Sequence, residues 1–355
     1  MTIERILKRT AVGGAMFAAA LTGTAHAATC GIISSGTTSA TVNYDPFNPT
    51  GLGATPITLR LQRVNGSGGE KTNIVNFYLR AHDSNANGTV VVANSVIVDG
   101  NFSGTGLDVF YDSTETPPVV APTSVDPSGG NKFLKIAFTG NNAASDIATV
   151  NFTVQLPPNL DLTNSPNLSF DAIFACSTTG SGSPTQQTGQ ITNAITFPIK
   201  VLNALQASYV GSDLAFGEIG NIANPLVVTP PSTSAVNNYV RVRSSGAYKV
   251  ELTSANGYRL TYPTGNLAVA NQRVNYQLEF LGTSRTESNP ALISKTCTRA
   301  GVPAGEEDKL YIRATLREGG QGKLVAPDYK DTLTVTISPL AVPVAPVPCS
   351  GLLGP

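Results

Sequence analysis

The sequence predicts an all-β protein built from two tandem β-sandwiches, and three observations support this prediction. Several short segments alternate apolar and polar residues, which is the period of a half-buried strand. Glycine and proline number 34 and 24 among 355 residues, too many for helices of ordinary length. No segment after residue 27 shows a 3.6-residue apolar period. Many short strands with closely spaced turns are typical of sandwiches.

The first 27 residues have the pattern of a secretory signal peptide. Arg5, Lys8 and Arg9 give a positive start, residues 11–21 are apolar and small, and residues 25–27 read Ala-His-Ala, which fits a cleavage site. The apolar run is about half of the roughly 20 residues that a membrane anchor needs. We therefore expect an exported protein that is cleaved after residue 27.

Alternating segments follow one another along the rest of the chain. The clearest are residues 57–64, which lead into the turn signal Asn65-Gly66, and then residues 150–156, 191–200, 248–253, 276–280 and 332–337. The apolar stretches 90–92 and 96–98 predict a buried strand pair, with an exposed adhesive finger as the alternative.

These segments group into two domains. We expect an N-terminal sandwich at residues 28–200, a second sandwich at residues 202–340 and a proline-rich tail at residues 341–355. Proline lacks the amide that a strand ladder needs, so the tail is expected to be extended polyproline rather than strand.

Four cysteines lie beyond the signal segment, in a compartment where disulfides persist: Cys30, Cys176, Cys297 and Cys349. Four cysteines allow three pairings, and the sequence alone does not choose among them. We favour Cys30–Cys176 and Cys297–Cys349, because each bridge then stays within one half of the chain. A metal site is disfavoured, since the sequence has no CxxC pair and lacks ligand histidines.

The charge balance argues against nucleic acid as a partner. The signal segment holds three of the 23 basic residues and one of the 23 acidic residues, which leaves 20 basic and 22 acidic. A face that binds nucleic acid needs clustered lysine and arginine. No apolar run after residue 27 is long enough to span a bilayer.

An enzymatic role is not expected. His82 is the sole histidine after residue 27 and lies in a polar stretch typical of a loop, so a catalytic triad or a zinc hydrolase site would lack its imidazoles. The acidic cluster Glu306, Glu307 and Asp308 is expected to be a charged turn rather than a catalytic carboxylate pair. We therefore predict no catalytic residue, no metal and no cofactor.

Three segments of the second half carry a family resemblance. Residues 214–219 resemble an "LxFG" opening strand, with Phe216 and Gly217 in its last two positions. Residues 240–250 resemble the second and third core strands. Residues 326–337 resemble a "PGxYxDTxTVTI" ending through Tyr329 and Asp331, with Asp328 where glycine is usual. Together they resemble the spore coat protein U or Csu-type pilin domain, the subunit class of archaic chaperone–usher pili. In the first half, Cys30 and residues 42–47 are similar to the "FGxYDP" opening of the same family.

The resemblance implies an immunoglobulin-like fold and a mode of assembly. The pilin domain of that family lacks its final strand, which a periplasmic chaperone or the next subunit supplies. In this sequence Leu333, Val335 and Ile337 would border the resulting groove. Cleavage after residue 27 would leave almost no donor segment before Cys30, which implies the position of a two-domain adhesin at the tip of the fibre.

The implied partners are a periplasmic chaperone, an outer-membrane usher, a neighbouring pilin subunit and an unknown surface or receptor. The implied role is attachment or biofilm formation at the cell surface. One alternative is a non-polymerised secreted or outer-surface coat protein with two complete sandwiches. Another is a secreted carbohydrate-binding or enzymatic module; the absence of tryptophan counts against sugar stacking, although Tyr44, Tyr78, Phe110 and Tyr111 could serve in part.

Overall fold

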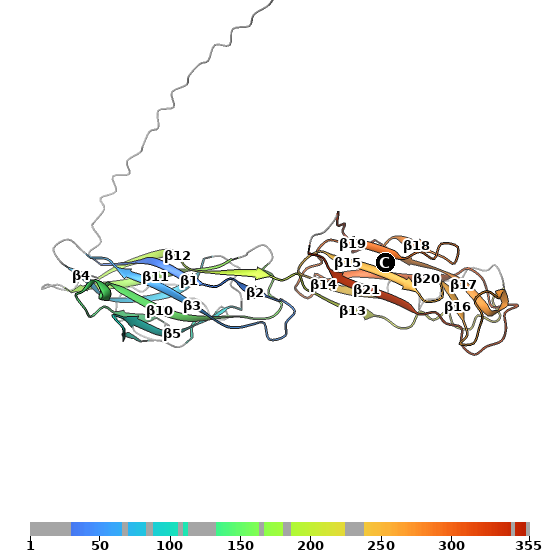
Figure 1. Ribbon diagram of the computed structural model, residues 1–355, viewed down its shortest axis with the longest axis horizontal. Helices are drawn as coiled ribbons and strands as arrows, with labels where there is room; N and C mark the ends of the chain where they lie inside the picture. The colour runs from blue at the N-terminus through green and yellow to red at the C-terminus, as the bar shows by residue number, and fades with distance from the viewer. Residues whose placement is uncertain are drawn as a thin grey trace, which may run out of the picture.

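The computed structural model describes residues 30–65, 70–82, 88–105, 109–112, 133–162, 167–179, 186–223, 238–341 and 345–352. The predicted signal peptide lies outside these residues. Within them the chain is all-β, apart from the short 3₁₀ helices η2 (Ala143–Asp146) and η4 (Ala270–Gln272). Figure 1 shows two elongated groups of strands lying end to end, β1 to β12 in one and β13 to β21 in the other.

The first sandwich has two sheets. One has the order β1-β3-β10-β5-β6, with β8 also paired to β5; the bounds are β1 (Ile32–Ser39), β3 (Leu52–Arg63), β10 (Ile147–Leu156), β5 (Val90–Val98), β6 (Asn101–Phe102) and β8 (Val109–Asp112). The other has the order β2-β12-β11-β4-β9-β7; the bounds are β2 (Val42–Tyr44), β12 (Gln186–Val201), β11 (Asn167–Thr179), β4 (Lys71–Ala81), β9 (Leu134–Ala137) and β7 (Gly104–Thr105).

Alternation along the strands builds the core of this sandwich. In β10, buried residues alternate strictly with less buried ones from Ile147 to Val154, which places Val150, Phe152 and Val154 between the sheets. Strand β12 closes the sandwich: it pairs antiparallel with β11 and parallel with β2. Its inward residues Ile195 and Phe197 are fully buried.

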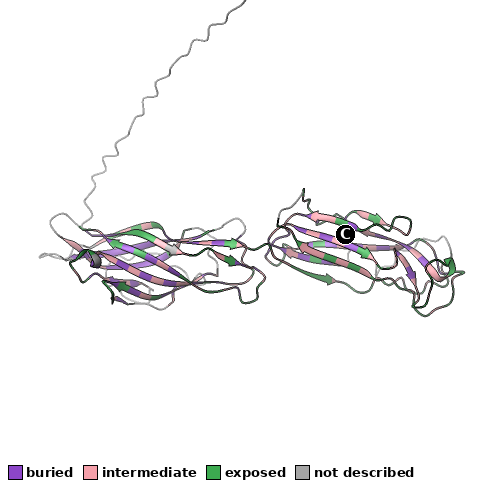
Figure 2. Cartoon of the chain, viewed as in Figure 1, coloured by how far each residue is buried: buried purple, intermediate pink, exposed green. Residues whose placement is uncertain are grey.

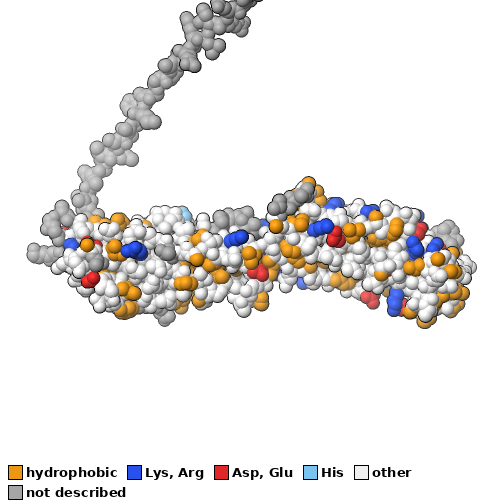
Figure 3. Space-filling view, viewed as in Figure 1, with side chains coloured by type: hydrophobic (Ala, Val, Ile, Leu, Met, Phe, Trp, Pro, Cys, Tyr) orange, Lys and Arg blue, Asp and Glu red, His pale blue; other side chains and the backbone are white. Residues whose placement is uncertain are grey.

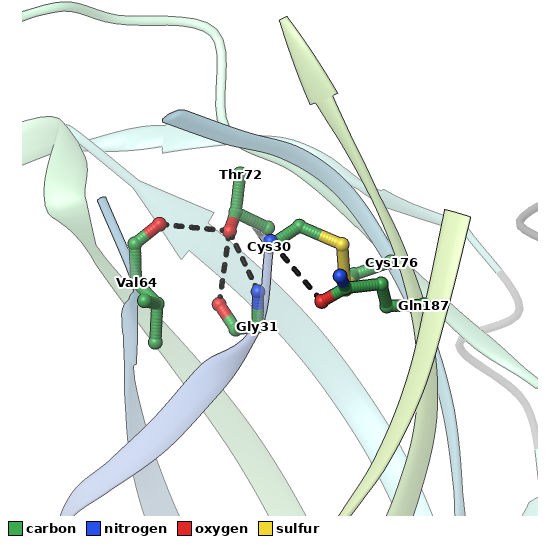
Figure 4. The surroundings of a disulfide bond; sticks show 6 residues. All are labelled: Cys30, Gly31, Val64, Thr72, Cys176 and Gln187. Atoms are coloured by element: carbon green, nitrogen blue, oxygen red, sulfur yellow. Dashed lines mark hydrogen bonds between the residues drawn. A yellow bond between two sulfur atoms is a disulfide. The ribbon is translucent and has the colours of Figure 1, made fainter. Parts of the chain in front are cut away.

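The two predicted disulfides are present in the favoured pairing, Cys30–Cys176 and Cys297–Cys349. Figure 4 shows how the first of them fixes the start of β1 against the body of the sandwich. The Gly31 amide donates to Thr72 Oγ1 at 2.9 Å, and that hydroxyl lies 2.9 Å from the carbonyl oxygen of Val64.

The second sandwich has a larger and a smaller sheet. The larger has the order β13-β14-β20-β17-β16, with β18 also paired to β17; the bounds are β13 (Leu205–Val210), β14 (Tyr239–Ser244), β20 (Asp308–Leu316), β17 (Arg273–Phe280), β16 (Arg259–Thr261) and β18 (Thr283–Arg285). The smaller has the order β19-β15-β21, with β19 (Ile293–Cys297), β15 (Tyr248–Ser254) and β21 (Leu333–Pro339).

Residues 202–204 join the sandwiches and are held by hydrogen bonds on both sides. The Leu202 amide donates to the Tyr44 carbonyl of the first sandwich at 2.9 Å, and the Ser245 amide of the second donates to the Ala204 carbonyl at 3.0 Å. Arg243 of β14 adds a hydrogen bond to Asn159 Oδ1 at 2.7 Å. The linker is therefore tied to both bodies.

Two expectations about strands are wrong. The stretches 90–92 and 96–98 form one strand, β5, because Val91, Ala93, Val96 and Val98 all face the core; a register shift against β10 at Asn151/Phe152 accommodates the polar residues between them. Residues 214–219 are not a strand: Gly217 has a φ of 71°, which breaks extended backbone, and the first strand of this sandwich is the earlier β13.

The acidic cluster at 306–308 is also not wholly a turn. Glu306 and Glu307 precede β20, but Asp308 is its first residue and is buried. Tyr248 donates a hydrogen bond of 2.5 Å to Asp308 Oδ2, and burial raises the pKa of this carboxyl although the hydrogen bond opposes the shift.

A buried ion pair in the first sandwich predicts acid sensitivity. Arg63 is 3% exposed and donates to Asp146 Oδ1 at 2.8 Å. Burial alone would raise the pKa of Asp146, but Arg63 and then Lys71 outweigh it, so the pKa lies below its ordinary 3.8. The ion pair therefore stabilises the fold above about pH 4, and this contribution is lost as pH falls through the lowered pKa.

We expect chemical unfolding of the first sandwich to show lower stability at pH 3 than at pH 7. The substitution Asp146→Asn should lower stability at pH 7 and flatten this pH dependence. An equally steep pH dependence in wild type and D146N would contradict the assignment.

Candidate strand-binding groove

The two sandwiches share the order of their central strands. The sheet order β1-β3-β10-β5 of the first matches β13-β14-β20-β17 of the second, and β11-β4-β9 matches β21-β15-β19. Among the described residues, β12, β2 beyond it and β7 at the other edge of that sheet have no counterpart. In the first sandwich β12 covers the edge of β11, whereas the same edge of β21 pairs with no strand that the structure describes.

A groove of about 1510 Å³ lies where the counterpart of β12 would be. One wall is β13, which presents Leu205, Ala207 and Tyr209. The other wall is β21. Core residues of the larger sheet reach its floor, from β14, β16, β17 and β20: Val240, Leu260, Tyr276, Ile312 and Ala314.

The structure places the three predicted groove residues, Leu333, Val335 and Ile337, on one face of β21, where they line the groove. Each is only half-buried, while the inward residues of neighbouring β15, such as Val250 and Leu252, are fully buried. Figure 2 shows this contrast between the buried strands and the largely intermediate and exposed wall strands. The apolar face of β21 is therefore incompletely covered.

The walls also have open backbone edges. Among the described strands, β13 pairs with β14 alone and β21 with β15 alone. A strand inserted between them could hydrogen-bond to β21 as β12 does to β11, and it would lie beside β13 as β12 lies beside β1. Each wall strand is roughly 20 Å long, the length of an ordinary strand.

The walls are joined near the linker, and residues that follow β13 line the other end of the groove. Near the linker, the side-chain amide of Asn203, just before β13, donates to the carbonyl oxygen of Leu340, just after β21. At the opposite end, residues 211–223 cross from β13 toward β14. The Gly320 amide donates to the Ile219 carbonyl at 3.0 Å, and a side chain at position 320 would collide with that backbone.

The motif residues of the resemblance build this end of the groove. Phe216 lines it, with its ring 6.3 Å from that of Tyr276. Asp331 fixes the start of β21: its carboxylate accepts hydrogen bonds from Tyr276 Oη at 2.6 Å and from the Asn256 amide at 3.0 Å. Burial, and then the charge of Asp331, raise the pKa of Tyr276. Tyr329 donates to the Leu324 carbonyl at 2.8 Å.

Sequence reasoning missed the β13 wall. The segment has the alternation Leu205, Ala207, Tyr209, which is a strand signal, but it is short and the apolar run at 214–219 attracted the assignment instead. Tyr209 is 49% exposed at the groove mouth.

His82 and the aromatic residues considered for sugar stacking lie in the first sandwich, apart from the groove. His82 lies 2.9 Å from the buried Asp171, which also accepts from the Asn193 amide and the Gln190 side chain, so this cluster fixes strands β4, β11 and β12 together. The aromatic residues proposed for sugar stacking, Tyr44, Tyr78 and Phe110, are buried, and Tyr111 is half-buried.

The described residues form neither a cluster of metal ligands nor a membrane-crossing helix. They contain no group of three or more His, Cys, Asp or Glu residues placed to hold a metal ion. They also contain no helix with the length and apolarity to cross a membrane. On the face seen in Figure 3, basic and acidic side chains are scattered over both sandwiches rather than gathered.

Comparison with known proteins gives distant structural likenesses. No protein-family model matches the chain, and no curated protein matches it. Among solved structures it is similar to a chain of a CFA/I fimbrial chaperone–tip adhesin complex, at 10% identity over 86% of this chain and 78% of that one, with a TM-score of 0.27. It is also similar to a C-terminal fragment of the major pilin of Streptococcus agalactiae, at 8% identity over 85% and 91%, with a TM-score of 0.24. A backbone pilin of Streptococcus pyogenes matches at 12% identity over 82% and 67%, with a TM-score of 0.23. At these TM-scores the likenesses are too distant to support a conclusion about this chain.

The incomplete cover of β21 predicts unequal costs for two matched substitutions. Val335→Thr places a hydroxyl in the open groove, where water satisfies it, so the free energy of unfolding should change by less than about 0.5 kcal/mol. Val250→Thr places the same group in the closed core on the adjacent strand and should cost about 1–3 kcal/mol. Denaturant unfolding of the full chain measures both. A cost at Val335 equal to that at Val250 would show that the groove is filled in solution.

Proposed function

We propose that this protein is a structural and adhesive subunit of a chaperone–usher type surface pilus, whose second sandwich accepts a β-strand from another polypeptide. The observation that supports the proposal is the missing counterpart of β12. An apolar groove with an open strand edge on each side is suited to strand addition, in which backbone hydrogen bonds give affinity and side-chain contacts give register.

The first sandwich supplies the geometry of the incoming strand. Strand β12 runs antiparallel to β11 and parallel to β1, whose Thr37 and Ser39 hydroxyls donate to the Ala194 and Thr196 carbonyls of β12. A strand in the groove would likewise run antiparallel to β21 and parallel to β13, with alternate side chains reaching the floor. Each large apolar side chain so buried contributes about 1.5–3 kcal/mol.

The proposal includes the position at the fibre tip. Residues from Cys30 onward are bound into the first sandwich by the disulfide and by β1, and β12 closes that sandwich from within the chain. The first sandwich thus needs no strand from outside, while the second does. We assign the accepting role to the second domain and attachment to an unidentified surface to the first, with a periplasmic chaperone, an outer-membrane usher and a neighbouring pilin subunit as partners and biofilm formation as an outcome.

The proposed role is binding and assembly, without catalysis or a cofactor, in a protein exported through the periplasm to the cell surface. The coat-protein alternative requires a complete second sandwich. No described strand pairs with the outer edge of β21.

Strand addition can be tested with the full chain and a peptide of roughly ten residues that alternates large apolar residues with threonine. The peptide should slow amide hydrogen exchange in β21 and β13 and raise the unfolding midpoint of the second sandwich. A control peptide with aspartate at two central apolar positions should do neither.

A matched pair of substitutions locates the binding. Val335 faces the groove, while the adjacent Thr336 is exposed on the other face of the same strand. Val335→Asp should abolish peptide binding, because it buries a charge against the strand, whereas Thr336→Asp should leave binding within about twofold. Equal loss in both variants, or no binding to the wild type, would refute the proposal.

A further inference from the structure

The described residues after β21, 340–341 and 345–352, lie away from the strand edge that borders the groove. The Leu340 amide donates to the Ala247 carbonyl at 3.0 Å, at the end of the sandwich. Farther on, Val347 lies parallel to β19: its amide donates to the Thr296 carbonyl at 3.1 Å, and the Thr298 amide donates to its carbonyl at 2.9 Å. Cys349 is 1% exposed and bonded to Cys297 at the end of β19.

This path is the opposite of the one in the first sandwich. There the chain turns after β11 and returns as β12 along the edge of β11. The segment after β21 instead crosses to the far side of the sheet, beyond β15 and β19. It covers the edge of β19 and leaves the edge of β21 open.

Strand register shows that the segment after β21 cannot lie in the groove while Cys349 is bonded to Cys297. Tyr248 of β15 pairs with Cys297 on one side and with Pro339 on the other, so the disulfide lies in the row where β21 ends. A hairpin that returned along β21 as far as Leu333 would carry Cys349 roughly 20 Å down the strand from that row. The two cysteines are bonded at a Cα separation of 5.4 Å.

We propose that the Cys297–Cys349 disulfide is a guard that holds the segment after β21 on the β19 edge and thereby reserves the groove for a strand of another polypeptide. This inference rests on the proposed function, because it presupposes that the groove accepts a strand. Without the bond, the segment is a tethered competitor for the groove, at an effective concentration on the order of millimolar. The prolines at 343, 346 and 348 weaken it as a strand without removing its advantage of tethering.

The first test compares two variants that both lack the bond and differ in the presence of the tail. One is Cys297→Ser with Cys349→Ser, and the other is the same double variant ending at Leu340. We expect the alternating peptide to bind the tail-bearing variant roughly tenfold or more weakly than the shortened one, while the oxidised wild type binds like the shortened one. Hydrogen exchange in β14 and β20 verifies that each variant is folded.

A second test traps the segment in the groove. In a Cys297→Ser background, Leu333→Cys places a thiol on the groove wall, and Thr334→Cys places one on the opposite face of β21 as the matched control. Under oxidising conditions, mass mapping should find a bond between position 333 and Cys349, and none from position 334.

The outcomes separate this inference from the proposed function. Equal peptide affinity in the tail-bearing and shortened variants, with no bond to position 333, would overturn the guard while leaving strand acceptance intact. Failure of the peptide to bind the wild type and both variants would overturn strand acceptance, and the guard with it.

Discussion

The architecture depends on one constraint: a β-sandwich is stable only when each of its inner faces is covered and its strand edges are paired or protected. The first sandwich meets this constraint by itself, because β12 pairs on both sides and buries Ile195 and Phe197. The second repeats the central strand order of the first, but none of its described residues forms a counterpart of β12. Its groove, its half-buried wall residues and its open wall edges all lie where that counterpart would pack.

The apolar area that an inserted strand would bury, together with its backbone hydrogen bonds, sets how tightly such a strand would bind. Leu333, Val335 and Ile337 are each half-buried, and an inserted strand would complete their burial while burying alternate side chains of its own. At roughly 25 cal/mol per Å² of apolar area, a few such side chains offset the entropy of ordering a ten-residue segment only if its backbone also pairs on both sides. The open edges of β13 and β21 provide those hydrogen-bond partners.

The alternation of apolar and polar residues predicted most of the long strands, but it did not predict β13 or the groove. Strands such as β10 and β15 were predictable because apolar and polar residues alternate cleanly along them. β13 was missed because it is short and because the apolar run around Phe216 resembles a strand until Gly217 breaks it. The residues of β21 were named from a family resemblance, yet the groove itself is an absence, and alternation gives no signal for a strand that the chain lacks. Likewise the cysteine pairing was favoured by position in the chain, whereas its location on the edge opposite the groove required the register of β19, β15 and β21.

The same register links the groove to the connection between the sandwiches. Strand β12 ends at Val201, three linker residues follow, and β13 begins at Leu205 as a groove wall. Asn203 of that linker bonds to the carbonyls of Ala247 and Leu340, so it holds the start of β13 beside the end of β21. Because a strand in the groove would run parallel to β13, a pull on it would load backbone hydrogen bonds along the whole wall in shear. The wall passes that load through the tethered linker directly to β12, the strand that closes the first sandwich. The groove therefore lies in line with the connection to the first domain, where a strand bound in it would transmit load.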